Sequence, residues 1–354
     1  MQIDAMLVPN LTIGLDLGDK SSWVCELDAR AQVVTSGSIP TTPAGIEAYF
    51  GNRTPCRVVL EVGTHSPWVS RLLARLGHET VVANPSAVYG KRRRKRRNDA
   101  KDAQYLARQG RADPLLLHPI QHRGPESQKH LGLLRARDSL VSTRTKLINH
   151  VRGAVKATGS RIERCSAEAF ARRAAQQIPL DLEPALGPLL LTIGHLTQSI
   201  RAFDRQIETL VDEQYPEARH LQQIRGVGPV TALAFVLLVD DPHRFECSRS
   251  VGAYFGLVPR LDESSESTPQ LRITKTGDKL GRRLLVSSAQ YILGPFGTDC
   301  DLRRHGELIA ARGGKNAKKR AAVAVARKLA VVMHRLWIRR EAYDPDHLAK
   351  QRAA

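Results

Sequence analysis

Four acidic residues in the first third of the chain have the types and spacing of a divalent-metal site. Asp16 interrupts the apolar segment LTIGLDLG, and Glu61 ends the apolar segment RVVLE. Asp99 and Asp102 are three residues apart, so they would share one face of a helix. Carboxylate oxygens suit Mg²⁺ or Mn²⁺, and such ions can stabilise the attacking and leaving oxygens of a phosphodiester. The alternative is structural, with Asp99 and Asp102 capping a helix and Asp16 in a turn, although burying an unpaired acid is costly.

Two basic segments indicate contact with a polyanion. The first directly precedes Asp99 and is formed by Lys91, Arg92, Arg93, Arg94, Lys95, Arg96 and Arg97. It contains no aromatic residue, which favours phosphate contact over base stacking, although a solvated loop would have the same composition. The second segment, GGKNAKKR, supplies Lys315, Lys318, Lys319 and Arg320. Cations grouped in this way predict a nucleic-acid-binding edge.

A serine-rich segment in the last third combines a possible nucleophile with cations. Ser264 and Ser265 follow Arg260 and precede Arg272 and Lys275. A serine hydroxyl can attack phosphorus once a base or metal activates it, and cations can stabilise the developing charge. An ordinary polar loop is the commoner explanation of such a segment. Nearby, IRGVGPVTA (224–232) resembles a helix–hairpin–helix turn, and a simple packing corner explains it equally well.

The elements that must position these residues fall into two classes. Apolar alternation predicts strands over 11–18, 23–27, 31–38, 57–62 and 79–84. Helical spacing predicts helices over 43–51, 66–77 and 99–110. This order predicts an α/β sheet covered by helices.

The rest of the chain reads as helical. Residues 128–159 and 189–215 predict two long helices, with Pro179, Pro184 and Pro188 between them. They would form a helical hairpin or coiled-coil arm, or else a plain helical bundle. The last third is mostly helical and ends in a basic helix. The predicted fold class is therefore α/β plus mostly α, with domains over 1–115, 116–218 and 219–354.

The overall charge favours a nucleic-acid partner. The 354 residues include 54 Lys and Arg against 35 Asp and Glu, a formal net charge of +19. Such an excess is typical of proteins that bind polyanions. No apolar run approaches the roughly 20 residues of a membrane span, and the N-terminus lacks the basic region of a signal peptide. A cytoplasmic protein without membrane association is expected.

The ordered motifs resemble those of insertion-sequence transposases of the IS-one-ten family, the DEDD transposases, which act as bridge-RNA-guided recombinases. The N-terminal half matches through IGLDLGDKSSWVCELD, VVLEVGTHSPWVSRLL, VVANPSAVYG and NDAKDAQYLAR. The C-terminal half matches through IRGVGPVTA, FGLVPR, LRITKTGD and GGKNAKKRAAVAVARKLAVVMHRLW. The resemblance covers nearly the whole chain, and the joint order of the motifs is highly specific.

This resemblance implies a ribonuclease-H-like (RuvC-like) N-terminal domain whose catalytic metal ligands are Asp16, Glu61, Asp99 and Asp102. It also implies a C-terminal transposase domain whose nucleophile is Ser264, four residues beyond Arg260. The family has glycine after that serine and this chain has Ser265, so both serines are candidates.

The resemblance further implies Mg²⁺ or Mn²⁺ as cofactor and three kinds of partner. These are DNA (the element ends and the target), a guide (bridge) RNA, and further copies of the chain in a dimer or tetramer assembled through the helical arm. Two rival functions are a Holliday-junction-resolvase-like nuclease that hydrolyses DNA with metal and without covalent serine chemistry, and a non-catalytic packaging protein.

Overall fold

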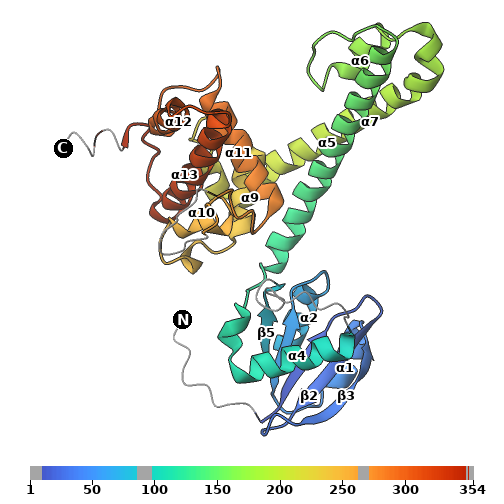
Figure 1. Ribbon diagram of the computed structural model, residues 1–354, viewed down its shortest axis with the longest axis vertical. Helices are drawn as coiled ribbons and strands as arrows, with labels where there is room; N and C mark the ends of the chain where they lie inside the picture. Colours follow the sequence, from blue (N-terminus) through green and yellow to red (C-terminus); the bar gives the residue numbers. More distant parts are fainter. Residues whose placement is uncertain (1–9, 86–97, 262–270, 348–349, 351–354) are drawn as a thin grey trace. The chain divides into compact units, whose positions relative to one another are not determined.

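In the computed structural model, which describes residues 10–85, 98–261, 271–347 and 350, a five-stranded sheet organises the N-terminal part (Figure 1). Its strands are β1 (Thr12–Asp16), β2 (Ser21–Leu27), β3 (Val33–Pro40), β4 (Arg57–Glu61) and β5 (Glu79–Ala83). The order across the sheet is β3-β2-β1-β4-β5. β1, β2 and β3 are antiparallel, whereas β4 pairs in parallel with both β1 and β5. The predicted meander and the two later strands are thus confirmed.

Strand alternation sends apolar side chains to both faces of this sheet. On one face, Ile13, Leu15 and other strand residues pack against α1 (Pro43–Phe50) and α2 (Ser66–Arg75). On the other face lies α4 (Asp99–Ala112), whose Ala103 and Leu106 are buried against the strands. A short 3₁₀ turn, η1 (Pro114–Leu117), follows α4. The sheet is therefore a middle layer between helices, as the sequence predicts.

Two long helices, α5 (Pro125–Ala157) and α7 (Glu183–Gln214), confirm the prediction for residues 126–214 and pack against each other (Figure 1). Between them lie α6 (Phe170–Ala175) and η2 (Leu180–Leu182). The predicted connection was too long, because Pro184 and Pro188 are inside α7. Pro184 is in the first turn, where N–H groups have no intrahelical acceptor, so its ring removes no hydrogen bond there.

The C-terminal third is helical, as predicted. Its helices are α8 (Pro216–Leu221), α9 (Pro229–Val239), η3 (Pro242–Arg244), α10 (Ser250–Tyr254), α11 (Lys279–Leu293), α12 (Asp301–Ala311) and α13 (Ala317–Arg339). Every residue of α9 from Thr231 to Val239 is buried, because α5, α7, α8 and α11 surround it. Among the helices that the structure describes, none combines the length and apolarity needed to cross a membrane.

Contacts divide the chain into two compact units, Met1–His122 and Arg123–Ala354, here called the N-terminal unit and the C-terminal unit. The core of the N-terminal unit lies between the sheet and its helices. In the C-terminal unit, Leu131 and Leu134 of α5 share one core with α9 and α13, and Val151 and Val155 share a second core with α7. The C-terminal unit therefore includes the predicted arm as well as the predicted C-terminal domain.

Candidate active site

Two of the predicted acids end neighbouring strands of the sheet. β1 and β4 pair in parallel with Leu15 beside Leu60, and each strand ends one residue later, at Asp16 and at Glu61. Both acids are partly exposed. Parallel pairing brings the carboxyl ends of the strands to the same edge, so these carboxylates occupy one end of the sheet. The local cause is two short apolar strands that each end in an acid.

The other two acids lie in the first turn of α4. The Asn98 side chain caps this helix, because its Oδ1 accepts a hydrogen bond from the Ala100 N–H at 2.9 Å. Asp99 is exposed, whereas Asp102 is only 7 % exposed. The spacing of three places both acids on adjacent turns of one helical face.

Two glycines let α4 lie directly on the strands. A Cβ at Gly14 in β1 would be 1.9 Å from the carbonyl oxygen of Ala103. A Cβ at Gly110 in α4 would be 2.3 Å from the Cγ2 of Val59 in β4. The helix backbone thus contacts the same two strands that end in Asp16 and Glu61.

The donor chemistry of these acids fits a hard divalent cation, since all four are carboxylates. Within the described part of the chain, however, no three His, Cys, Asp or Glu side chains are close enough to hold one metal ion. The structure therefore places two acids at adjacent strand ends and two on the helix across those strands, and it does not close a coordination shell around them.

A histidine that the sequence analysis did not single out follows Glu61. The Trp68 indole N–H donates to His65 Nδ1 at 3.1 Å, so the neutral ring carries its proton on Nε2. That nitrogen lies 3.8 Å from the Asp19 carboxylate, which comes three residues after Asp16. A histidine four residues beyond a strand-end acid is the sequence signal that could have identified it.

Ser264, Ser265 and Lys91–Arg97 lie outside the described residues. The residues that flank the serine segment are described, and they form a short ribbon. Pro259 and Ile273 make an antiparallel bridge, and the Arg260 N–H donates to the Arg272 carbonyl at 3.0 Å. The Thr274 N–H also donates to the Val258 carbonyl at 2.9 Å.

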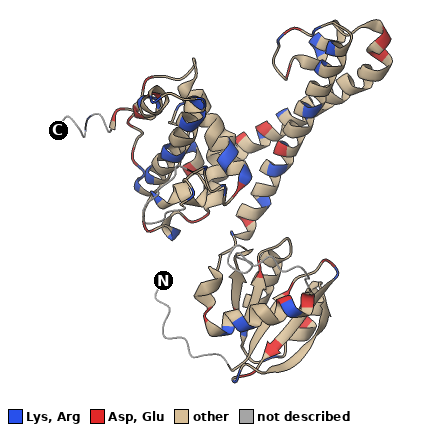
Figure 2. Cartoon of the chain, viewed as in Figure 1, with Lys and Arg blue, Asp and Glu red and all other residues tan. Residues whose placement is uncertain are grey.

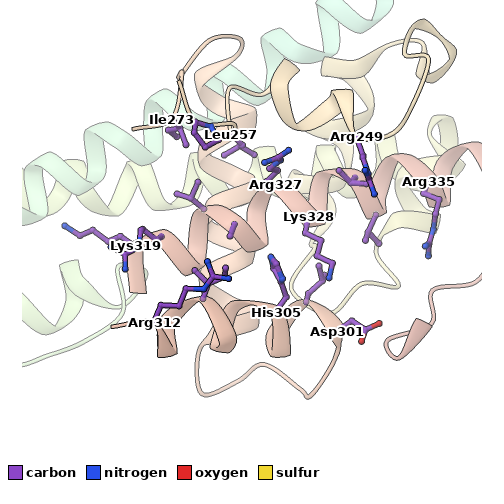
Figure 3. Close-up of a pocket in the computed structure, with 18 of the residues that line it drawn as sticks. Arg249, Leu257, Ile273, Asp301, His305, Arg312, Lys319, Arg327, Lys328 and Arg335 are labelled. Carbon is purple, nitrogen blue, oxygen red and sulfur yellow. The ribbon is translucent and has the colours of Figure 1, made fainter. Parts of the chain in front are cut away.

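A large basic cavity opens beside this ribbon within the C-terminal unit (Figure 3). Its volume is about 1590 Å³, and its lining includes nine Lys and Arg against two Asp. The cations are Arg249, Arg272, Lys275, Arg312, Lys319, Arg320, Arg327, Lys328 and Arg335. Four of these were predicted to bind nucleic acid, namely Arg272, Lys275, Lys319 and Arg320. Arg260, Lys315 and Lys318, which are also described, are not among the lining residues.

One face of α13 supplies most of this charge, and Figure 2 shows Lys and Arg recurring along that helix. Arg327, Lys328 and Arg335 were not chosen as site residues, because the sequence of this helix reads mainly as apolar core. Its apolar residues are buried, as expected. The missed signal is that cations recur eight residues apart, at Lys319, Arg327 and Arg335, and all three line the cavity.

His305 of α12 points into the cavity toward α13, close to Lys328 (Figure 3). Burial is the main cause that lowers the pKa of this imidazole, and the charges of Lys328 and Arg312 lower it further. The cavity therefore holds a histidine that the surrounding cations favour in its neutral form.

Comparison with known proteins decides the family. A DEDD-type model described as "Transposase" matches residues 13–159, and a model described as "Transposase IS116/IS110/IS902 family" matches residues 218–295. The transposase for insertion sequence element IS1111A of Coxiella burnetii is 28% identical over 94% of this chain and 90% of its own length. A probable family 20 transposase of Pseudomonas aeruginosa is 28% identical over 94% of this chain and 98% of its own length. The putative transposase y4pF/y4sB of Sinorhizobium fredii is 30% identical over 83% of this chain and 76% of its own length.

The chain belongs to the IS110 (IS-one-ten) family of insertion-sequence transposases. Transposases are enzymes that cut and rejoin DNA, so DNA is a partner of this IS110-family transposase. Membership of the DEDD class implies use of a divalent metal ion. All four predicted acids lie within the first matched region, and Ser264 with its flanking arginines lies within the second.

Proposed function

We propose that this IS110-family transposase cuts and rejoins the DNA of its own element by transesterification at Ser264, guided by a bridge RNA. The observation that carries the proposal is the pair of acids at adjacent parallel strand ends, Asp16 and Glu61, with α4 and its two acids packed across the same strands. The strand order β3-β2-β1-β4-β5, with three antiparallel strands and then two parallel ones, supports a ribonuclease-H-like (RuvC-like) domain.

The covalent step needs only the serine and the DNA as reactants. The Ser264 Oγ bonds to the scissile phosphorus while the bond from phosphorus to one deoxyribose oxygen breaks. The serine proton passes to a carboxylate or water, and the departing oxygen takes up a proton. Attack on the phosphoserine by the hydroxyl of a new strand end then restores a phosphodiester and releases Ser264.

In this proposal the acids and the cations have separate tasks. Asp16, Glu61, Asp99 and Asp102 would hold Mg²⁺ or Mn²⁺, and the bound ion would supply Lewis-acid stabilisation of the scissile phosphate. The cations contact the phosphate backbone of the nucleic acid. They are the cations of the cavity together with Arg260, Lys315, Lys318 and Lys91–Arg97. Sequence is chosen by base pairing with the RNA, so the protein mainly contacts phosphates. Dimers or tetramers form through α5 and α7.

The serine is tested by trapping the adduct with labelled DNA on a denaturing gel. Ser264→Ala is expected to bind DNA and form no adduct, whereas Ser265→Ala keeps most of the activity. An adduct that survives in Ser264→Ala and disappears in Ser265→Ala moves the nucleophile by one residue. Cleavage by the unsubstituted chain without any adduct would favour the nuclease alternative.

The acids are tested separately from binding. Asp16→Ala and Glu61→Ala are expected to abolish recombination while nucleic-acid affinity is kept, because removing an acid takes away no phosphate contact. Wild-type recombination by either variant in Mg²⁺ would show that the acids are misassigned. The RNA is tested by adding a transcript of the DNA that flanks the gene, on which recombination is expected to depend.

A further inference from the structure

Two exposed aromatic rings of the C-terminal unit form an apolar pair outside the basic cavity. Tyr291, near the end of α11, is 41 % exposed, and Phe296 in the following turn is 71 % exposed. Their rings are nearly parallel, at 25°, with centroids 6.5 Å apart. That separation lies in the range of offset-stacked aromatic pairs. A single exposed ring is ordinary, but two exposed rings stacked on each other require an explanation.

The turn that carries Phe296 is held rigidly. The Arg303 guanidinium donates to the carbonyls of Ile292, Gly294 and Gly297 at 3.1, 2.9 and 3.1 Å. A Cβ at Gly297 would be 2.0 Å from the Ile292 carbonyl oxygen, so the chain closes tightly there. Three hydrogen bonds thus hold the backbone of the turn that presents Phe296 to solvent, which is the arrangement expected of a pre-organised contact.

Tyr291 of this pair lies against the turn of the motif IRGVGPVTA. A Cβ at Gly226 would be 3.0 Å from the Tyr291 ring, so this ring rests on the glycine backbone, whose φ is +100°. The exposed Arg225 precedes this glycine and lines a small recess together with Ile292 and Thr298, which flank the Phe296 turn. Arg225 makes no ion pair with any residue that the structure describes, whereas Asp299 nearby is paired with Arg304 at 2.5 Å.

We infer that Tyr291 and Phe296 form a stacking platform for an unpaired nucleobase, with Arg225 placed for the adjacent phosphate. Single-stranded nucleic acid binds proteins by stacking its bases on aromatic rings beside cations. A base inside a duplex presents no free face, so the ligand is an unpaired base at a strand end, a loop or a flipped position. The inference extends the activity on DNA and does not depend on the serine chemistry.

The size of the patch distinguishes this ligand from a protein partner. An aromatic side chain buries about 150–250 Å² at most, so two rings offer up to about 500 Å². A specific protein interface buries roughly 1,200–2,000 Å². The +19 charge of the chain also favours a polyanion over a typical protein surface.

The test measures binding of the full chain to an oligothymidylate, to the same backbone with abasic sites, and to a duplex. Phe296→Ala is expected to weaken binding of the oligothymidylate about tenfold, since one stacked base contributes ~1–3 kcal/mol, and to leave abasic and duplex binding unchanged. Phe296→Trp is expected to keep the affinity. Leu308→Ala is the matched control, because Leu308 is 66 % exposed and apolar but has no ring.

A parallel binding measurement with an oligouridylate distinguishes RNA from DNA as the source of the base. Equal weakening of abasic and normal strands by Phe296→Ala would overturn the inference, and so would unchanged binding of both oligothymidylate and oligouridylate. Thermal unfolding of each variant confirms that the fold is kept. A change in sedimentation without any change in binding would assign the rings to protein contact instead.

Discussion

His305 is the residue whose protonation should report on ligand binding. Its pKa is lowered by burial, then by Lys328 and Arg312, while Asp301, Asp344 and His347 also line the cavity. A phosphate in the cavity would offset the two cations and raise this pKa, so binding takes up a proton. Affinity for duplex DNA is therefore expected to rise as the pH falls below about 6.5, the ordinary histidine value.

Fluorescence anisotropy of the full chain with labelled duplex, measured between neutral and mildly acidic pH, checks this expectation. His305→Gln should flatten the pH dependence of the affinity. His347 is the other histidine of the lining, and His347→Gln should leave most of the pH dependence unchanged. The same rise in affinity in His305→Gln would assign the proton to another group.

At the scale of elements, the contact between α4 and β1 should control both stability and activity. A Cβ at Gly14 would overlap the Ala103 carbonyl at 1.9 Å, so Gly14→Ala must push α4 off the strand. Overpacking of this kind costs about 1–3 kcal/mol. A lower thermal midpoint and a loss of recombination are expected. Gly37→Ala in β3 is the control, since nothing lies within 4 Å of its Cβ, and equal midpoints for the two variants would contradict the role of this contact.

The cationic face of α13 should carry part of the salt dependence of DNA binding. Lys328→Gln is expected to reduce the slope of log K against log salt by about 0.9, the value for one lost phosphate contact on B-DNA. The exposed Arg339 in the last turn of α13 does not line the cavity, so Arg339→Gln serves as the control. Filter binding over a range of salt concentrations measures both slopes, and an unchanged slope in Lys328→Gln would remove this lysine from the interface.

The sequence predicted the individual helices and strands better than it predicted which of them pack together. Alternation and helical spacing located the five strands and the long helices, because these patterns depend only on neighbouring residues. α7 begins at Glu183, earlier than predicted, because Pro184 lies in its first turn, where a proline costs no hydrogen bond. The role of Gly14 and the basic cavity could not be predicted, because both depend on partners distant in sequence, such as Ala103 and the ribbon at Ile273.

At the scale of the whole molecule, two units with separate cores should unfold separately. The N-terminal core lies around the sheet, and the C-terminal cores lie around α9 and α7. Calorimetry of the full chain is therefore expected to show two transitions. Gly14→Ala should lower only the transition of the N-terminal unit. A single transition, or equal shifts of both transitions, would contradict separate cores.

Backbone hydrogen bonds join Arg260 to Arg272 and Val258 to Thr274, so the scaffold fixes both ends of segment 261–271 whatever residues lie between them. Loop-closure entropy changes slowly with length, and segments of other lengths can therefore start and end at the same two positions. The paired ends of the ribbon thus provide fixed attachment points between which one segment can be replaced by another. Grafting the corresponding segment of a relative between Arg260 and Arg272 would exchange the serine segment without redesigning the surrounding helices.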